Sequence, residues 1–286
     1  MIEVKPFYDA ATFTLTFLVY DSVSKDAVVI DPVMDYDPQG SVISHEQSDA
    51  ITEFLKNKNL SLHYIIETHA HADHLSSSQV LKKRFPKSQV VIHEKIKEVQ
   101  KIFKGVFNLE ESFPTDGSQF DRLLKDDETF NAGSITIKVL HTPGHTPACA
   151  SFLIENHLFT GDALFMPDYG TGRCDFPSGS SENLFDSIQK IYQLPDSTKV
   201  YVGHDYQPNG RALEFESTIG EEKRSNIQLN EHTKKDDFVQ FRNRRDNTLK
   251  APRLLLASIQ VNINAGHLPK PESNGKSYLK IPLNVS

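Results

Sequence analysis

The stretch His69-Ala70-His71-Ala72-Asp73-His74 places four side chains of metal-binding type within six residues. It comes shortly after Tyr64-Ile65-Ile66, an apolar segment typical of a buried β-strand. The intervening alanines leave the backbone free to turn tightly into a helix, which is predicted over residues 74–85. In such a turn, His69 and His71 can face one metal position while Asp73 and His74 face a neighbouring one. The motif therefore predicts a metal site at the end of a strand.

Three further residues of ligand type also follow apolar, strand-like segments: His145, Asp162 and His204. Strand ends in α/β proteins are where ligand sites gather, because the loops there converge on one edge of the sheet. Imidazole and carboxylate ligands suit zinc, iron or manganese, and no thiol lies within these motifs, so a cysteine-rich structural zinc site is disfavoured. The other histidines are interpreted as ordinary core or surface residues: His45, His63, His93, His141, His157, His232 and His267.

Length and composition limit the class of protein. The 286 residues are enough for one large domain with an extension, which we place at residues 1–210 and 211–286. The absence of a signal or transit pattern, together with only two cysteines, Cys149 and Cys174, favours a reducing, cytoplasmic setting. The net charge of -7 argues against nucleic acid as a partner, and no apolar run approaches the roughly 20 residues of a membrane span.

Periodicity predicts strands that later alternate with helices. Leu15, Phe17 and Val19 share one face of the first strand. Strands are expected over residues 14–20, 27–31, 62–66, 89–92, 134–140, 148–154, 157–159 and 199–202. Helices are expected over 48–55, with Ser48 as its cap, and over 74–85, 94–103, 181–194, 212–230 and 234–249. Residues 35–48 are expected to form a loop, and the tail after Pro252 to be mostly extended.

The complete ligand set resembles that of the metallo-β-lactamase superfamily. The resemblance spans roughly residues 13–206 and implies an α/β fold, the four-layer αββα sandwich, with the metal site at one edge between two β-sheets. The resembling ligands are His69, His71, Asp73, His74, His145, Asp162 and His204.

Further motifs resemble the branch that contains glyoxalase II and the persulfide dioxygenases. Residues 142–146, Thr-Pro-Gly-His-Thr, and 161–164, Gly-Asp-Ala-Leu, match this branch. The loop at 170–176, Gly-Thr-Gly-Arg-Cys-Asp-Phe, is similar to the Gly-Arg-Thr-Asp-Phe loop of persulfide dioxygenases, with Cys174 in place of threonine. His204-Asp205-Tyr206 fits the dioxygenase pattern as well, and the tail from Pro252 to Leu283 resembles a bacterial subgroup of these enzymes.

The resemblance implies an oxidoreductase with one Fe(II) per chain, bound by His69, His145 and Asp162. Two histidines and one carboxylate form a facial triad that leaves coordination positions open for O2 and substrate. The implied substrates are glutathione persulfide and O2, and the products are sulfite and glutathione. The resemblance also suggests that the protein forms a homodimer. The remaining ligand-type residues would support the triad or hold a second metal: His71, Asp73, His74 and His204.

Three residues are candidates for substrate contact, each with a competing interpretation. Arg173 can hold a glutathione carboxylate through its guanidinium group, or it can form a loop ion pair with Asp175. Tyr206 can hydrogen-bond the substrate or simply be packed. Cys174 can react with persulfide, although an unreactive thiol is favoured. A basic set can attract an anionic substrate, although a solvated helix face is favoured: Arg242, Arg244, Arg245 and Lys250.

The ligands alone leave other functions open. A thioester hydrolase of the glyoxalase II type would use two zinc ions, or mixed iron and zinc, about 3.5–4 Å apart, with Asp162 as the bridge. A lactonase or β-lactamase is a weaker version of this alternative. A non-catalytic redox sensor using iron and Cys174 is a third. The preference for a dioxygenase rests on the loop around Arg173 and on the tail.

Overall fold

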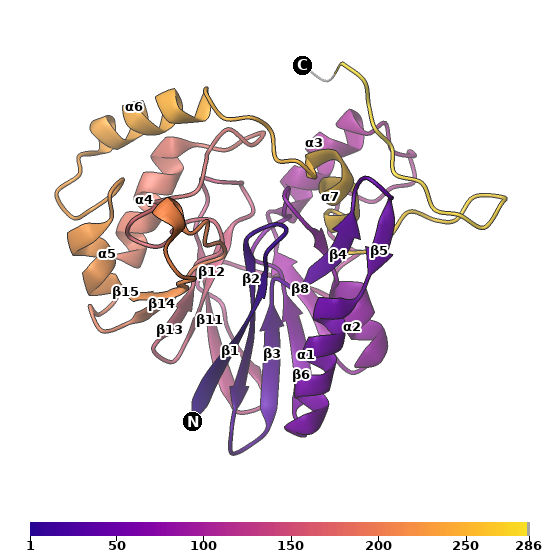
Figure 1. Ribbon diagram of the computed structural model, residues 1–286, viewed down its shortest axis with the longest axis horizontal. Coiled ribbons are helices and arrows are strands. Elements are labelled where there is room, and N and C mark those ends of the chain that lie inside the picture. The colour runs from indigo at the N-terminus through magenta and orange to yellow at the C-terminus, as the bar shows by residue number, and fades with distance from the viewer. Residues whose placement is uncertain (285–286) are drawn as a thin grey trace.

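Two mixed β-sheets face each other at the centre of the computed structural model, which describes residues 1–284 (Figure 1). The first sheet has three antiparallel strands followed by three that continue in parallel from β3. Its order is β1 (Ile2–Asp9), β2 (Thr14–Asp21), β3 (Asp26–Ile30), β6 (Ser61–Ile66), β8 (Gln89–His93) and β9 (Arg122–Leu124).

The second sheet is antiparallel except for one pair, β13 and β14, which run in parallel. Because these two strands end at the same edge, the residues that follow them, Asp162 and His204, emerge side by side. The order is β10 (Thr129–Ala132), β11 (Ile135–His141), β12 (Ala150–Ile154), β13 (His157–Phe159), β14 (Lys199–Tyr201) and β15 (Glu216–Thr218).

Helices cover the outer face of each sheet, which completes the four-layer αββα sandwich of the α/β class. On the first sheet these are α1 (Glu46–Asn57), α2 (Ser78–Arg84) and α3 (Ile96–Val106). On the second they are α4 (Ser181–Ile191) and α5 (Ile219–Ser225), and α6 (Lys235–Asp246) packs on α4. A third, small sheet lies beside α7 (Leu255–Asn262), in the order β5 (Val42–Ser44), β4 (Val33–Asp37) and β7 (Leu75–Ser76).

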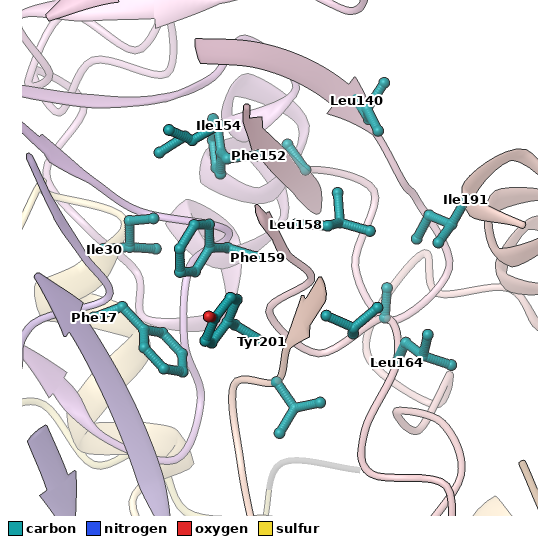
Figure 2. Close-up of a cluster of buried hydrophobic side chains, with 14 of the residues drawn as sticks. Phe17, Ile30, Leu140, Phe152, Ile154, Leu158, Phe159, Leu164, Ile191 and Tyr201 are labelled. Atoms are coloured by element: carbon teal, nitrogen blue, oxygen red, sulfur yellow. The ribbon is translucent and has the colours of Figure 1, made fainter. Parts of the chain in front are cut away.

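Strand alternation divides the core into the layers of the sandwich. Leu15, Phe17 and Val19 of β2 point between the two sheets, whereas Leu18 and Tyr20 point under the helices of the first sheet. Figure 2 shows the inner layer, where Phe17 lies near Phe159 and Tyr201 of the second sheet. Burying one large apolar side chain contributes about 1.5–3 kcal/mol, so this layer holds the two sheets, and the loops at their edge, in a fixed relation.

The structure corrects four expectations about the elements. Residues 35–48 are not all loop: they contain the end of β4, the strand β5 and the start of α1, whose N-cap position is His45 rather than Ser48. The helix predicted over 74–85 begins only at Ser78, because Leu75 and Ser76 pair with β4. Within 212–230 only α5 is α-helical, since residues 216–218 pair with β14. The tail after Pro252 does not begin as an extended segment, because residues 255–262 form the helix α7.

None of the helices within residues 1–284 is long and apolar enough to cross a membrane. The division at residue 210 stays a prediction. Beyond it, β15 adds a strand to the second sheet, α6 lies on α4, and α7 lies against the small sheet on the other side of the molecule (Figure 1).

Candidate metal centre

Three predicted ligands from three separate strand ends converge at one edge of the sandwich. The Nε2 atoms of His69 and His145 lie 4.0 and 3.6 Å from Oδ2 of Asp162. One ligand atom from each of the three residues lies within 4.8 Å of the others, and all three side chains are buried. Two imidazoles and one carboxylate in such a cluster form a set that suits non-haem iron or zinc.

A second group adjoins the first. His71, Asp73 and His74 also bring ligand atoms within 4.8 Å of one another. His204 connects the two groups, because its Nε2 lies 3.3 Å from Oδ1 of Asp162 and 3.4 Å from Oδ2 of Asp73. The structure therefore brings together all seven residues that the sequence singled out, and the arrangement offers room for one metal or for two.

Unpartnered buried atoms test whether these residues fit a metal. Four buried side-chain atoms of the two groups have no hydrogen-bond partner within residues 1–284. They are Nε2 of His69, Nδ1 of His71, Nε2 of His74 and Oδ1 of Asp162. Leaving a buried polar group without a partner costs about 1–3 kcal/mol. Such atoms in two adjoining groups are explained if a cation completes their coordination, so these residues fit a metal ion.

The opposite nitrogen of each of three ligand histidines faces a backbone oxygen. Nδ1 of His145 lies 2.7 Å from the carbonyl oxygen of Arg173. Nδ1 of His74 lies 3.2 Å from that of Leu75, and Nδ1 of His204 lies 3.2 Å from that of Phe13. A hydrogen bond from Nδ1–H to a carbonyl fixes the tautomer that leaves Nε2 free for a metal.

Asp31, which follows β3, was not singled out from the sequence. It accepts hydrogen bonds from the backbone N–H and the hydroxyl of Thr68, at 2.7 and 2.8 Å, and its Oδ1 lies 2.9 Å from Nε2 of His71. Burial lowers the pKa of His71, but Asp31 and Glu67 outweigh burial and raise it well above its usual value. Asp31 therefore holds the loop before His69 and places a carboxylate against the imidazole of His71.

Neighbouring charges and burial also shift the pKa values of His69 and Asp73. Burial lowers the pKa of His69 well below its usual value, and the neighbouring imidazoles of His71 and His145 lower it further. Burial raises the pKa of Asp73, but His204 and His74 outweigh burial and bring it down to about 2. Neutral imidazole and ionised carboxylate are the forms that bind metal ions.

Asn262, at the end of α7, ties the metal-binding loop to the C-terminal part of the chain. Its side-chain N–H groups donate to the carbonyl oxygens of His71 and His74, each at 2.8 Å, and its Oδ1 accepts from the backbone N–H of Ser76 at 2.8 Å. The side chain is buried. Sequence reasoning missed this residue, because nothing in the local pattern connects residue 262 with residues 71–76.

A pocket of about 230 Å³ opens beside Asp162, one of the predicted metal ligands. The loop at residues 170–173 forms part of its wall and approaches closely: a Cβ added at Gly172 would lie 1.9 Å from the carbonyl oxygen of Asp162. Only glycine allows this approach. The pocket is lined by Asp162, Phe165, Tyr169, Thr171, Arg173, Tyr206, Arg242, Arg245 and Leu249.

Arg173 lines this pocket with its guanidinium group already engaged. Nε and Nη2 donate to the two carboxylate oxygens of Asp175, and Nη1 donates to the carbonyl oxygen of Lys250 at 2.8 Å. The ion pair that we considered as the competing interpretation is therefore present. A role for Arg173 in binding a substrate carboxylate stays a prediction.

Tyr206 and Cys174 occupy different surroundings. Tyr206 stacks on Tyr169 and His204, with ring centroids 4.7 and 5.5 Å apart, and also lines the pocket. Tyr206 is 36% exposed, but the packing around its hydroxyl, together with Asp162 and Asp73, raises its pKa well above the usual value, so the hydroxyl keeps its proton. Cys174 is buried, and burial raises its pKa too, which favours the unreactive thiol.

Comparison with known proteins identifies the class. The profile of the metallo-beta-lactamase superfamily matches residues 11–204, and the chain belongs to this superfamily. It is 49% identical to Glyoxylase B2 of Dictyostelium discoideum, over 99% of this chain and 97% of that protein. It is 31% identical to the mitochondrial persulfide dioxygenase ETHE1 of Homo sapiens, over 80% of this chain and 76% of that protein. The crystal structure of ETHE1 from Myxococcus xanthus matches with a TM-score of 0.73 and 29% identity, covering 93% of this chain and 100% of that one.

Proposed function

We propose that the protein is a persulfide dioxygenase that converts glutathione persulfide, O2 and water into glutathione and sulfite. The observation that carries the proposal is the group of two histidines and one carboxylate, His69, His145 and Asp162, of which Asp162 also lines a pocket. Such a triad leaves several coordination positions of an Fe(II) ion open. The likeness to the human persulfide dioxygenase and to the Myxococcus structure supports the same reaction.

His69, His145 and Asp162 would hold the Fe(II) ion, which supplies the redox chemistry that lets O2 react with a closed-shell sulfur compound. The chain contributes position and proton control around it. The carbonyl oxygen of Arg173 orients His145. The protonated hydroxyl of Tyr206 is available as a hydrogen-bond donor to the substrate, and the rings of Phe165 and Tyr169 form an aromatic part of the pocket wall.

A second candidate is a two-metal thioester hydrolase acting on S-lactoylglutathione. The second ligand group, with His204 between Asp73 and Asp162, favours it, since two metals held by such a set can activate water. The higher identity to Glyoxylase B2 favours it as well. In the dioxygenase, the second group serves instead to orient the triad and its surroundings.

One paired experiment separates the two functions. The protein is purified from iron-replete and from zinc-replete cells, and its metal content, its O2 consumption with glutathione persulfide and its cleavage of S-lactoylglutathione are measured. We expect about one iron per chain and O2 uptake with sulfite as product. Two zinc ions per chain, no O2 uptake from either preparation and rapid thioester cleavage would overturn the proposal in favour of the hydrolase.

A further inference from the structure

Three arginines line the pocket beside Asp162, and they differ in how their charge is used. Arg173 pairs with Asp175 through two nitrogens and bonds Lys250 through the third. Arg242 is buried, and donates to Asp246 through Nε and Nη2, at 3.0 and 2.7 Å.

The remaining donor of Arg242 is engaged too. Its Nη1 donates to Oε1 of Gln228 at 2.9 Å and to the carbonyl oxygen of Thr171 at 3.3 Å. The expectation of a solvated helix face is therefore wrong for this residue, which belongs to the core beneath α6. Neither Arg173 nor Arg242 has a nitrogen left without a protein acceptor.

Arg245 is different. Its side chain is exposed at the edge of the same pocket, and within residues 1–284 it forms no ion pair and donates no hydrogen bond. Each of the other two arginines is matched by a carboxylate, Asp175 or Asp246, and Asp162 belongs to the metal cluster, so within residues 1–284 Arg245 is the pocket arginine without a carboxylate partner. This charge stands out on a chain whose net charge is -7.

We propose that Arg245 binds a carboxylate of the substrate and thereby selects carboxylate-bearing thiol derivatives; the proposal rests on the function proposed above. A guanidinium group binds a carboxylate bidentately with geometry that lysine lacks. Arg245 acts as a specificity-determining residue: it touches the part of the substrate away from the reacting sulfur and contributes to its binding.

The size and lining of the pocket agree with a substrate whose reacting sulfur lies inside the pocket and whose carboxylates lie outside it. A volume of about 230 Å³ is below the roughly 300–1,000 Å³ of sites that enclose a whole drug-sized ligand. A tripeptide thiol derivative would place its sulfur end beside Asp162, along the aromatic wall of Phe165 and Tyr169, and leave its charged ends at the rim. Arg245 and Leu249 lie on α6 and just after it, where those ends would emerge.

A purely structural explanation for Arg245 has to be separated from this one. Basic residues in the last turn of a helix stabilise it by interacting with the negative end of the helix dipole. Arg244, in the same turn of α6, supplies that effect equally, is also exposed, and is not among the residues lining the pocket. Arg244 is therefore a matched control with the same charge, helix and exposure.

The test measures binding of glutathione and of its diethyl ester to the metal-loaded protein by calorimetry, for the parent chain and for Arg245→Gln and Arg244→Gln. We expect Arg245→Gln to weaken glutathione binding about three- to tenfold, as suits a partly exposed charge-assisted contact. The ester, which lacks both carboxylate charges, should bind the parent and Arg245→Gln alike. Arg244→Gln should bind glutathione like the parent.

Turnover provides a second readout with the same variants and glutathione persulfide. Arg245→Gln should raise KM and leave kcat unchanged, because the contact is the same in the ground state and in the transition state. Equal weakening by both variants, or loss of ester binding in Arg245→Gln, would overturn the role of Arg245. If the parent binds glutathione in the expected pattern but shows no O2 uptake, the dioxygenase proposal fails while the carboxylate contact stands.

Discussion

The two sides of the candidate site are built in opposite ways. On the metal side, the ligands are buried, come from strand ends and keep polar atoms without protein partners. On the pocket side, protein acceptors satisfy Arg173 and Arg242, and within residues 1–284 Arg245 is the pocket arginine that is exposed without a partner. The metal side therefore has buried atoms free to bind a metal ion, whereas most of the charged groups on the pocket side are already paired within the protein.

This difference separates what decides the reaction from what decides the substrate. The sheets fix the spacing of the ligands, so a change there should remove the metal and all activity. The pocket wall is made by the 170–176 loop and by α6, which lie outside the sheets. Changes there should alter affinity while the metal stays bound.

The largest effect is expected from Asp162→Ala. Asp162 faces both ligand groups, so its loss should remove the metal and lower turnover by more than the roughly hundredfold that the loss of an orienting partner costs. Metal analysis and O2 uptake measure both quantities. Asp186→Ala, which removes an exposed carboxylate paired with Lys235, should keep metal and activity. Retention of the full metal content in Asp162→Ala would remove Asp162 from the site.

A smaller loss of metal affinity is expected from Asn262→Ala. The variant removes the amide that holds the backbone of His71, His74 and Ser76, so metal affinity should fall about 10- to 100-fold. The free energy of unfolding should fall by about 1–3 kcal/mol, because buried groups lose their partners. A chelator competition and a denaturant titration provide these values.

Asn264→Ala is the matched control for that variant. Asn264 lies two residues further along, is only partly buried, and makes one long contact of 3.4 Å to the carbonyl oxygen of His267. It should keep the parent's metal affinity. If Asn262→Ala is destabilised but binds metal as tightly as the parent, α7 supports the fold and not the metal site.

The smallest effect is expected from Cys174→Ser, on the pocket side. The thiol is buried and its pKa is raised by burial and by Asp246, so it stays protonated and unreactive. Burying a hydroxyl in its place should cost about 1 kcal/mol of stability, while turnover stays within about twofold. Loss of turnover with the metal retained would contradict this and show that the Cys174 thiol takes part in the reaction.

Much of the fold could be predicted because its signals are local. The alternation of Leu15, Phe17 and Val19 follows from strand geometry alone, and the structure confirms it. The helix α7 escaped prediction because it is buried on most of its surface and so lacks an amphipathic pattern. The polar stretch 212–230 was overpredicted as helix, since tertiary pairing with β14 decides the conformation of residues 216–218.

The grouping of the seven ligand-type residues could be predicted for a similar reason, because the 69–74 motif, His145, Asp162 and His204 each come shortly after an apolar strand. The pocket could not. Which arginines of the 242–245 segment face the pocket depends on the rotation of α6 about its own axis where it packs on α4. No local sequence pattern encodes that rotation. Asn262 was equally hidden, since an amide 188 residues from His74 gives no signal until the chain is folded.

The contact between His145 and Arg173 has an evolutionary consequence. His145 is oriented by the backbone carbonyl of residue 173, and every amino acid carries the same carbonyl. Mutation at this position can therefore replace the side chain at the pocket wall while the hydrogen bond to the imidazole persists. The wall of the pocket can in this way change during evolution while the orientation of the His145 imidazole is retained.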